Sequence, residues 1–157
     1  NGHPVGAVIT SNKNMETFRK SYRYFNTFGG NPVSCAASLS VLNIIKEENL
    51  MENAQSVGNY AIKGLRDLSK VYEIIGDVRG EGLFFGVELV LDRKLKTPAR
   101  DITNKIVNEM KDEGVLLSKL GINYNTLKIR PPMSFSLKNA DYLLEKLDKV
   151  LLRNKLK

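Results

Sequence analysis

The spacing of apolar residues changes period along this chain, and that change most restricts the folds open to it. Over residues 32–68 apolar side chains recur at intervals near 3.6, the period of a helix. Over residues 83–89 the large apolar residues Leu83, Phe85, Val87 and Leu89 occupy every second position, which is the period of a strand. A helical period returns at residues 98–113. From about residue 70 onward the pattern therefore predicts a compact α+β unit.

Apolar spacing and helix-capping residues together predict the remaining helices and strands. Asn31 and Pro32 suit a helix start, as an N-cap residue followed by proline at the first helical position. The helix they open should bury one apolar stripe, formed by Val33, Ala36, Ala37, Val41, Ile44 and Ile45. The other predicted elements are strands over residues 5–10, 83–90, 115–118 and 127–130, and helices over residues 15–20, 50–68 and 98–113 and after Ser136.

Composition limits the class of protein. The chain has 157 residues with 42% hydrophobic content, enough for one sizeable core, and no apolar run approaches the ~20 residues that span a bilayer. The net charge of +7 is spread along the predicted helices, so we expect neither a nucleic-acid nor a membrane partner. The only cysteine, Cys35, cannot form an internal disulfide, which favours a reducing, cytoplasmic setting. One histidine and one cysteine are too few for a metal cluster or a Ser-His-Asp set.

A short loop before Pro32 contains the parts of a phosphate site. Thr27 supplies a hydroxyl, Gly29 and Gly30 leave backbone N–H groups free, and a helix N-terminus follows. The alternative is an ordinary glycine turn that leads into a capped helix. The residues by themselves favour this plainer alternative, because glycine turns before helices are common.

Arg130 is the second candidate, since it ends an apolar strand and is followed by two prolines. A guanidinium held there would offer two parallel donors to a carboxylate or phosphate. The alternative is an arginine that faces solvent or pairs with a structural acid, and spacing does not decide between the two. We expect Arg79 to fix the bend beside Asp77, and Lys128 to lie on the opposite strand face from Arg130 and to be solvated.

Four segments, taken in order, resemble one enzyme family. They are NGHPV at residues 1–5, YFNTFGGNPVSCAA at 24–37, GDVRGEGLFFGVEL at 76–89 and LKIRPPM at 127–133. Together they resemble the C-terminal portion of class-III aminotransferases of the ornithine/alanine–glyoxylate type, from end to end of the chain. Residues 24–37 and 128–133 look closest to the phospho-lyase branch, whereas residues 45–53 and 76–82 resemble the alanine–glyoxylate branch. The branch therefore stays open.

The resemblance implies an α/β fold, the C-terminal part of a pyridoxal-phosphate (PLP)-dependent transferase of fold type I. Residues 1–50 would be the tail of the large PLP-binding domain with its interdomain helix, and residues 51–157 the small α+β domain. It further implies a homodimer that shares its sites across the interface. Thr27 would bind the PLP phosphate in the partner's site, with Gly29 and Gly30 allowing close approach. Arg130 matches the arginine that holds the substrate carboxylate.

The family's Schiff-base lysine precedes the segment with which this chain begins. We therefore expect that lysine upstream of Asn1, assign no catalytic residue here and expect the chain alone to be inactive. The first expected function is transfer of an amino group between an amine or amino acid and a keto acid. The second is a phospho-lyase that acts on phosphoethanolamine or phosphohydroxylysine. The third is a non-catalytic fragment that dimerises or packs against a partner.

Overall fold

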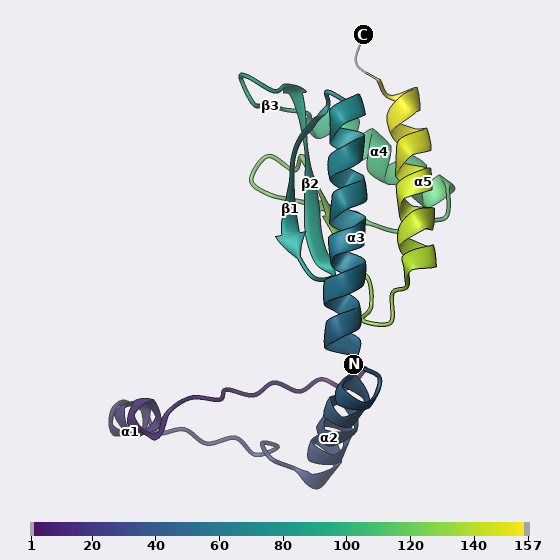
Figure 1. Cartoon of the computed structure of the whole chain (residues 1–157). Coiled ribbons are helices and arrows are strands. Elements are labelled where there is room, and N and C mark those ends of the chain that lie inside the picture. Colours follow the sequence, from purple (N-terminus) through teal and green to yellow (C-terminus); the bar gives the residue numbers. More distant parts are fainter. Residues whose placement is uncertain (1, 156–157) are drawn as a thin grey trace. The chain divides into compact units, whose positions relative to one another are not determined.

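The computed structural model describes residues 2–155. Asn1, with which the segment at residues 1–5 begins, and residues 156–157, the end of the expected 51–157 domain, lie outside the described residues. The chain divides into two compact units, Asn1–Asn49 and Leu50–Lys157, here called the first and second units. Each is described by itself (Figure 1).

The first unit contains two helices, α1 (Asn12–Ser21) and α2 (Pro32–Glu47). Both begin at a side-chain cap: Ser11 accepts a hydrogen bond from the amide of Asn14, and Asn31 accepts one from the amide of Ser34. Pro32 occupies the first helical position, as the sequence predicted. The two helix predictions in this unit are therefore confirmed, and α1 is longer than expected.

Two other expectations for the first unit are wrong. Residues 5–10 form no strand, and the side chains of Val8 and Ile9 are 87% and 97% exposed. A strand needs a neighbour for its backbone groups, and the described residues of this unit contain none. The apolar stripe of α2 is also not fully buried: Ala37, Val41 and Ile45 are half-buried, and Val33 is exposed.

The second unit is an antiparallel sheet covered by three helices. Its elements are α3 (Leu50–Val71), β1 (Ile75–Glu81), β2 (Phe84–Asp92), β3 (Thr97–Pro98), α4 (Arg100–Asp112), β4 (Ser118–Leu120), β5 (Thr126–Ile129) and α5 (Leu137–Arg153). The strand order is β1-β2-β5-β4, and β3 pairs with β2. In Figure 1, α3 and α5 run side by side along one face of the sheet. The strand predicted over residues 115–118 is displaced, because β4 begins only at Ser118.

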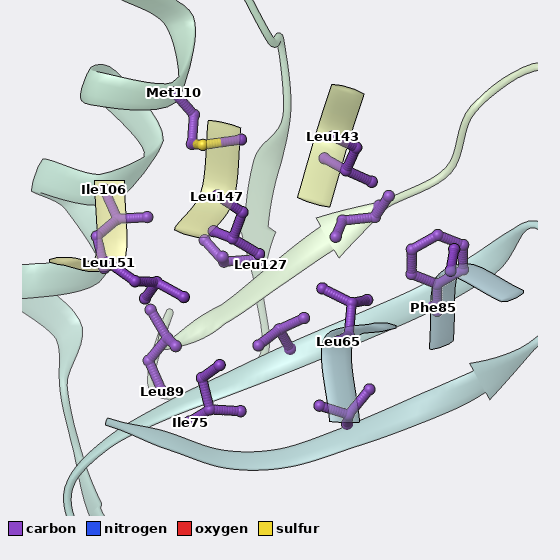
Figure 2. Close-up of a cluster of buried hydrophobic side chains, with 14 of the residues drawn as sticks. Leu65, Ile75, Phe85, Leu89, Ile106, Met110, Leu127, Leu143, Leu147 and Leu151 are labelled. Carbon is purple, nitrogen blue, oxygen red and sulfur yellow. The ribbon is translucent and has the colours of Figure 1, made fainter. Parts of the chain in front are cut away.

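The core of the second unit lies between the sheet and the helices (Figure 2). The alternation predicted for residues 83–89 is confirmed, since Leu83, Phe85, Val87 and Leu89 are all buried. Each helix contributes fully buried side chains to the same cluster: Leu65 from α3, Ile106 and Met110 from α4, and Leu147 and Leu151 from α5. A continuous core of this kind fixes the positions at which the strands end.

A close backbone approach sets α3 against the turn between β1 and β2. A Cβ atom on Gly58 would lie 1.9 Å from the carbonyl oxygen of Gly82, so only glycine fits at this point of the helix. Gly82 itself has a φ of +53°, a left-handed conformation that glycine adopts without steric cost. The two glycines together allow the β1–β2 turn to pack directly against α3.

Candidate functional site

Arg130 lies directly after β5, at the edge of the core of the second unit. Ile129 before it is buried, whereas the side chain of Arg130 is exposed. Within residues 2–155 its guanidinium makes no hydrogen bond and no ion pair. The alternative of a structural acid partner is therefore not realised in the described chain; the side chain faces solvent, and its donors remain available to a ligand.

Arg79 is engaged, in contrast to Arg130. Its Nη1 atom donates to Asp77 Oδ2 at 2.7 Å and to Glu88 Oε2 at 2.6 Å. These carboxylates, Asp77 first, raise the pKa of Arg79 above its ordinary value. The prediction that Arg79 fixes the bend beside Asp77 agrees with this geometry, and the two carboxylates already balance its positive charge.

Arg93 is an engaged arginine that sequence reasoning missed. Its Nε donates to the carbonyl oxygens of Glu73 and Ile75, at 3.1 and 3.0 Å. Its Nη2 donates to the carbonyl oxygens of Tyr72, at 3.0 Å, and of Ser69. The side chain therefore satisfies carbonyl groups at and beyond the end of α3. No local signal would have revealed this, because the partners are backbone atoms 18–24 residues away.

Lys128 lies on the same side of β5 as Arg130, which corrects the prediction of opposite faces. Residues two apart along a strand share a face, so the prediction misapplied the period. The two cationic side chains line a hollow of about 290 Å³, together with Ser118, Leu116 and Leu117. Ser118 is the direct cross-strand partner of Lys128. Two cations and a hydroxyl on one hollow suit an anion, including one with two negative charges.

The turn with Thr27 belongs to the first unit and is exposed throughout. The side-chain oxygen of Asn26 accepts from the amides of Phe28, at 3.1 Å, and Gly29, at 3.0 Å. The N–H group of Gly29, one of the two expected to be free, is therefore occupied, because an Asx-type turn closes on it. The Thr27 hydroxyl has no hydrogen-bond partner among residues 2–155 and remains available.

Glycine is needed at positions 29 and 30 for different structural reasons. Gly30 has a φ of +70°, and a Cβ atom there would meet nothing within 4 Å, so glycine is needed for backbone conformation alone. A Cβ on Gly29 would lie 3.2 Å from Cβ and Cγ of Asn26, so the missing side chain makes room for the turn. Their predicted role in close approach to a ligand stays a prediction.

A local network fixes the start of α2. Asn31 accepts from the amide of Ser34 at 2.9 Å and donates to the carbonyl of Phe28 at 2.7 Å. The Nε2 atom of His3 lies 2.8 Å from the hydroxyl of Ser34 and so joins the segment after residue 1 to the helix. His3 has no carboxylate partner there, and across the described residues no three His, Cys, Asp or Glu side chains gather as a metal site would require.

None of the helices in the described part of the chain has the length and apolar character needed to cross a bilayer. This finding agrees with the absence of a long apolar run in the sequence.

Comparison with known proteins shows what the chain is similar to. It is 51% identical over 148 residues to alanine–glyoxylate aminotransferase 2 homolog 2, mitochondrial, of Arabidopsis thaliana, covering 94% of this chain and 31% of that protein. A phospholyase from Arthrobacter, solved in complex with phosphoethanolamine, superimposes with a TM-score of 0.90 at 40% identity, covering 96% of this chain and 36% of the other. A PLP-bound amine transaminase from an uncultivated Pseudomonas species gives a TM-score of 0.78 at 31% identity, over 87% of this chain and 31% of the other.

These similarities confirm the fold predicted from the sequence, the C-terminal part of a PLP-dependent transferase of fold type I. The chain spans about a third of the length of these relatives. Both branches that the sequence left open, the alanine–glyoxylate and the phospho-lyase branch, are represented among them. The family model described as aminotransferase class-III matches residues 1–151. The chain belongs to the class-III aminotransferase family.

Proposed function

We propose that this chain is the C-terminal section of a PLP-dependent aminotransferase, which transfers an amino group between an amine or amino acid and a keto acid. Family membership over residues 1–151 supports the reaction class. The observation that carries the role of this section is the unengaged guanidinium of Arg130 at the end of β5. It is available to bind the carboxylate that amino acids and keto acids share.

In this proposal the two units belong to different domains of the enzyme. The first unit, Asn1–Asn49, is the end of the large cofactor-binding domain, with α2 as the interdomain helix, and the second unit is the small domain. The enzyme is a homodimer in which Thr27 reaches the site of the partner subunit. The exposure of the Thr27 turn supports this placement, because an interface residue is accessible when its subunit is considered alone.

The turn around Thr27 fits the phosphate of PLP. Its hydroxyl is available, no acidic residue lies among residues 24–32, and the positive end of α2 follows. When bound, PLP stabilises the negative charge that develops at the substrate carbon as a proton leaves. Thr27 donates a hydrogen bond to the phosphate, and Gly30 maintains the turn that places the hydroxyl.

Thr27→Ala tests this assignment in the full-length enzyme. Loss of a hydrogen bond to a charged group should weaken PLP retention by about 1.5–3 kcal/mol, measured as a dissociation constant by absorbance titration. Thr17→Ala is the matched control, because its hydroxyl donates only to the backbone of Lys13 within α1. Unchanged PLP affinity in Thr27→Ala would remove Thr27 from the site.

Arg130 binds and orients the substrate. A bidentate pair between its guanidinium and a carboxylate fixes both the position and the plane of that group, which brings the amino end to a defined place. Lys128 beside it adds positive charge to the same hollow. Together they favour amino acids and keto acids over plain amines.

Arg130→Ala in the full-length enzyme tests the proposed function. The KM for L-alanine should rise about 10- to 100-fold, because charge-assisted hydrogen bonds to the carboxylate are lost. Amines without a carboxylate should react as before. Arg66→Ala on the exposed face of α3 is the control. An equal loss on amines and amino acids would contradict a carboxylate-binding role for Arg130.

A phospho-lyase is the second candidate, and the arrangement of Lys128, Arg130 and Ser118 around one hollow favours it. A phosphate monoester carries up to two negative charges, which two cations match better than one. Under this candidate the full-length enzyme releases phosphate from phosphoethanolamine without a keto acid, and Lys128→Ala suppresses that release. Turnover that depends strictly on a keto acid, with no phosphate released, would exclude it.

The third candidate, a non-catalytic packing fragment, is tested on the chain itself. It should neither bind PLP covalently nor yield a borohydride-trapped lysine, whereas the full-length enzyme should do both. A trapped lysine within this chain would make it a cofactor-binding unit in its own right. The cytoplasmic setting stays a prediction, because the Arabidopsis relative is named mitochondrial.

A further inference from the structure

The segment that follows Arg130 is held at several points within the second unit. Phe135 packs against the hydrophobic core, and its amide donates to the carbonyl of Pro132 at 3.0 Å. Ser136 then caps α5 in a reciprocal pair with Asn139. Between these anchors, two backbone carbonyl groups, those of Met133 and Phe135, are bound by a side chain from another helix.

That side chain is Asn53, in the first turn of α3. Its Nδ2 atom donates to the carbonyl oxygen of Met133 at 2.8 Å and to that of Phe135 at 3.0 Å. Both amide hydrogens are therefore used, and the side chain is partly buried. The orientation of the carboxamide follows from its partners, because the reversed orientation would set its oxygen against two carbonyl oxygens.

We propose that Asn53 is a positioning residue for Arg130, and this inference rests on the proposed function of Arg130 in anion binding. Arg130 has no partner within the described chain, so only the backbone on its two sides sets the direction in which its side chain leaves the end of β5. Buried Ile129 fixes the side before it. On the other side, Pro131 and Pro132 link Arg130 to the segment that Asn53 binds. Because proline fixes φ, this link is stiff, and the position of the segment constrains the backbone of Arg130.

The consequence is a specific effect on anion binding. Without the two hydrogen bonds, residues 133–135 lose their tie to α3, and Arg130 loses the fixed backbone that directs it. A charge-assisted hydrogen bond weakens steeply when its donor is displaced or misaligned, so the anion loses part of its binding energy. A ligand group that does not touch Arg130 should be insensitive to the same change.

The test uses the full-length, PLP-loaded enzyme with two probes, phosphoethanolamine and ethanolamine, which differ in the anionic group. Asn53→Asp retains the shape and removes both donors, and Asn53→Ala removes them without adding a charge. Asn59→Asp on the same helix is the matched control, because Asn59 is exposed and its side-chain oxygen accepts only from Gln55. Dissociation constants come from the change in cofactor absorbance.

Both Asn53 variants should bind phosphoethanolamine roughly 10- to 100-fold more weakly, the factor that follows from loss of a hydrogen bond to a charged group, with ethanolamine affinity unchanged. Hydrogen exchange should accelerate at the amides of residues 133–135 in both, and Asn59→Asp should match the unmodified enzyme. In an Arg130→Ala background, Asn53→Ala should add no further loss, since the residue it positions is absent.

Three results would overturn the inference. Unchanged phosphoethanolamine affinity in both Asn53 variants, with Arg130→Ala impaired, would remove Asn53 and leave the role of Arg130 intact. Equal weakening of both probes would show a general structural effect instead of positioning. Unchanged phosphoethanolamine affinity in Arg130→Ala would overturn the inference and the role of Arg130 in the phospho-lyase candidate, whereas its carboxylate-binding role is decided by the KM for L-alanine.

Discussion

The two units of the chain differ in the interactions that stabilise them. No described side chain of the first unit is buried, whereas the second unit has a continuous core between a sheet and three helices. Both nevertheless begin a helix at a side-chain cap, Asn31 in one and Ser136 in the other. Local hydrogen bonds thus specify turns and helix starts in both units, but only the second turns its apolar pattern into burial.

Truncation of a leucine in each unit tests that contrast most strongly. Leu65→Ala leaves a cavity at a fully buried position and should lower the free energy of unfolding by about 2–5 kcal/mol. Leu39 is 58% exposed, so Leu39→Ala should change it by less than about 0.5 kcal/mol. Urea denaturation of this chain measures both. Equal losses would mean that the α2 surface is covered in solution and would break the comparison.

A pair of glycines sharpens the contrast between close packing and local conformation. Gly58→Ala forces a Cβ into the carbonyl of Gly82 and should lower the free energy of unfolding by about 1–3 kcal/mol, despite the higher helix propensity of alanine. Gly30→Ala meets no neighbour and strains only its own left-handed backbone. It should leave urea unfolding of the second unit unchanged. A neutral Gly58→Ala would contradict the close approach.

Alkaline pH should weaken the second unit through Tyr72. Burial, and then the hydrogen bond to Asp148, raise the pKa of Tyr72 from 10.0 to about 12. Above pH 10 the unfolded chain loses this proton while the folded unit retains it, so the contribution to stability is full below pH 10 and is lost as pH rises through 12.

The expected loss between pH 10 and 12 is about 2 kcal/mol, read from urea unfolding at a series of pH values. Tyr72→Phe should flatten the curve in that range. Tyr24→Phe in the first unit is the control, because its ring is 71% exposed. An unchanged slope in Tyr72→Phe would assign the alkaline loss to other groups.

Much of the second unit was predictable because its signals are local and periodic. The alternation through Phe85 and Val87, the stop of α4 near Gly114 and the cap at Ser136 all follow from spacing and residue type. The first unit shows the limit of the same reasoning. Residues 5–10 read as a strand, but pairing depends on a neighbour that spacing within the segment does not specify.

The candidate site divides in the same way. Arg130 was predictable, because its place after an apolar strand and before two prolines is visible in the sequence. Lys128 was misplaced by an error in strand period, which the sequence itself would have corrected. Asn53 and Arg93 were not predictable, because both bind backbone carbonyl groups that tertiary folding brings to them from distant parts of the chain.

The helix caps give the smallest effect and the finest test of how the units differ. Ser136→Ala removes a reciprocal cap from a helix that packs in the core, so its cost of about 1 kcal/mol should register in cooperative unfolding of the second unit. Asn31→Ala removes a cap of similar strength from α2, whose apolar side chains are not buried within its unit. It should lower helix content and speed hydrogen exchange at residues 33–35, with little change in the urea midpoint. If both caps shift the midpoint equally, α2 unfolds together with the sheet, and the two units form one cooperative structure.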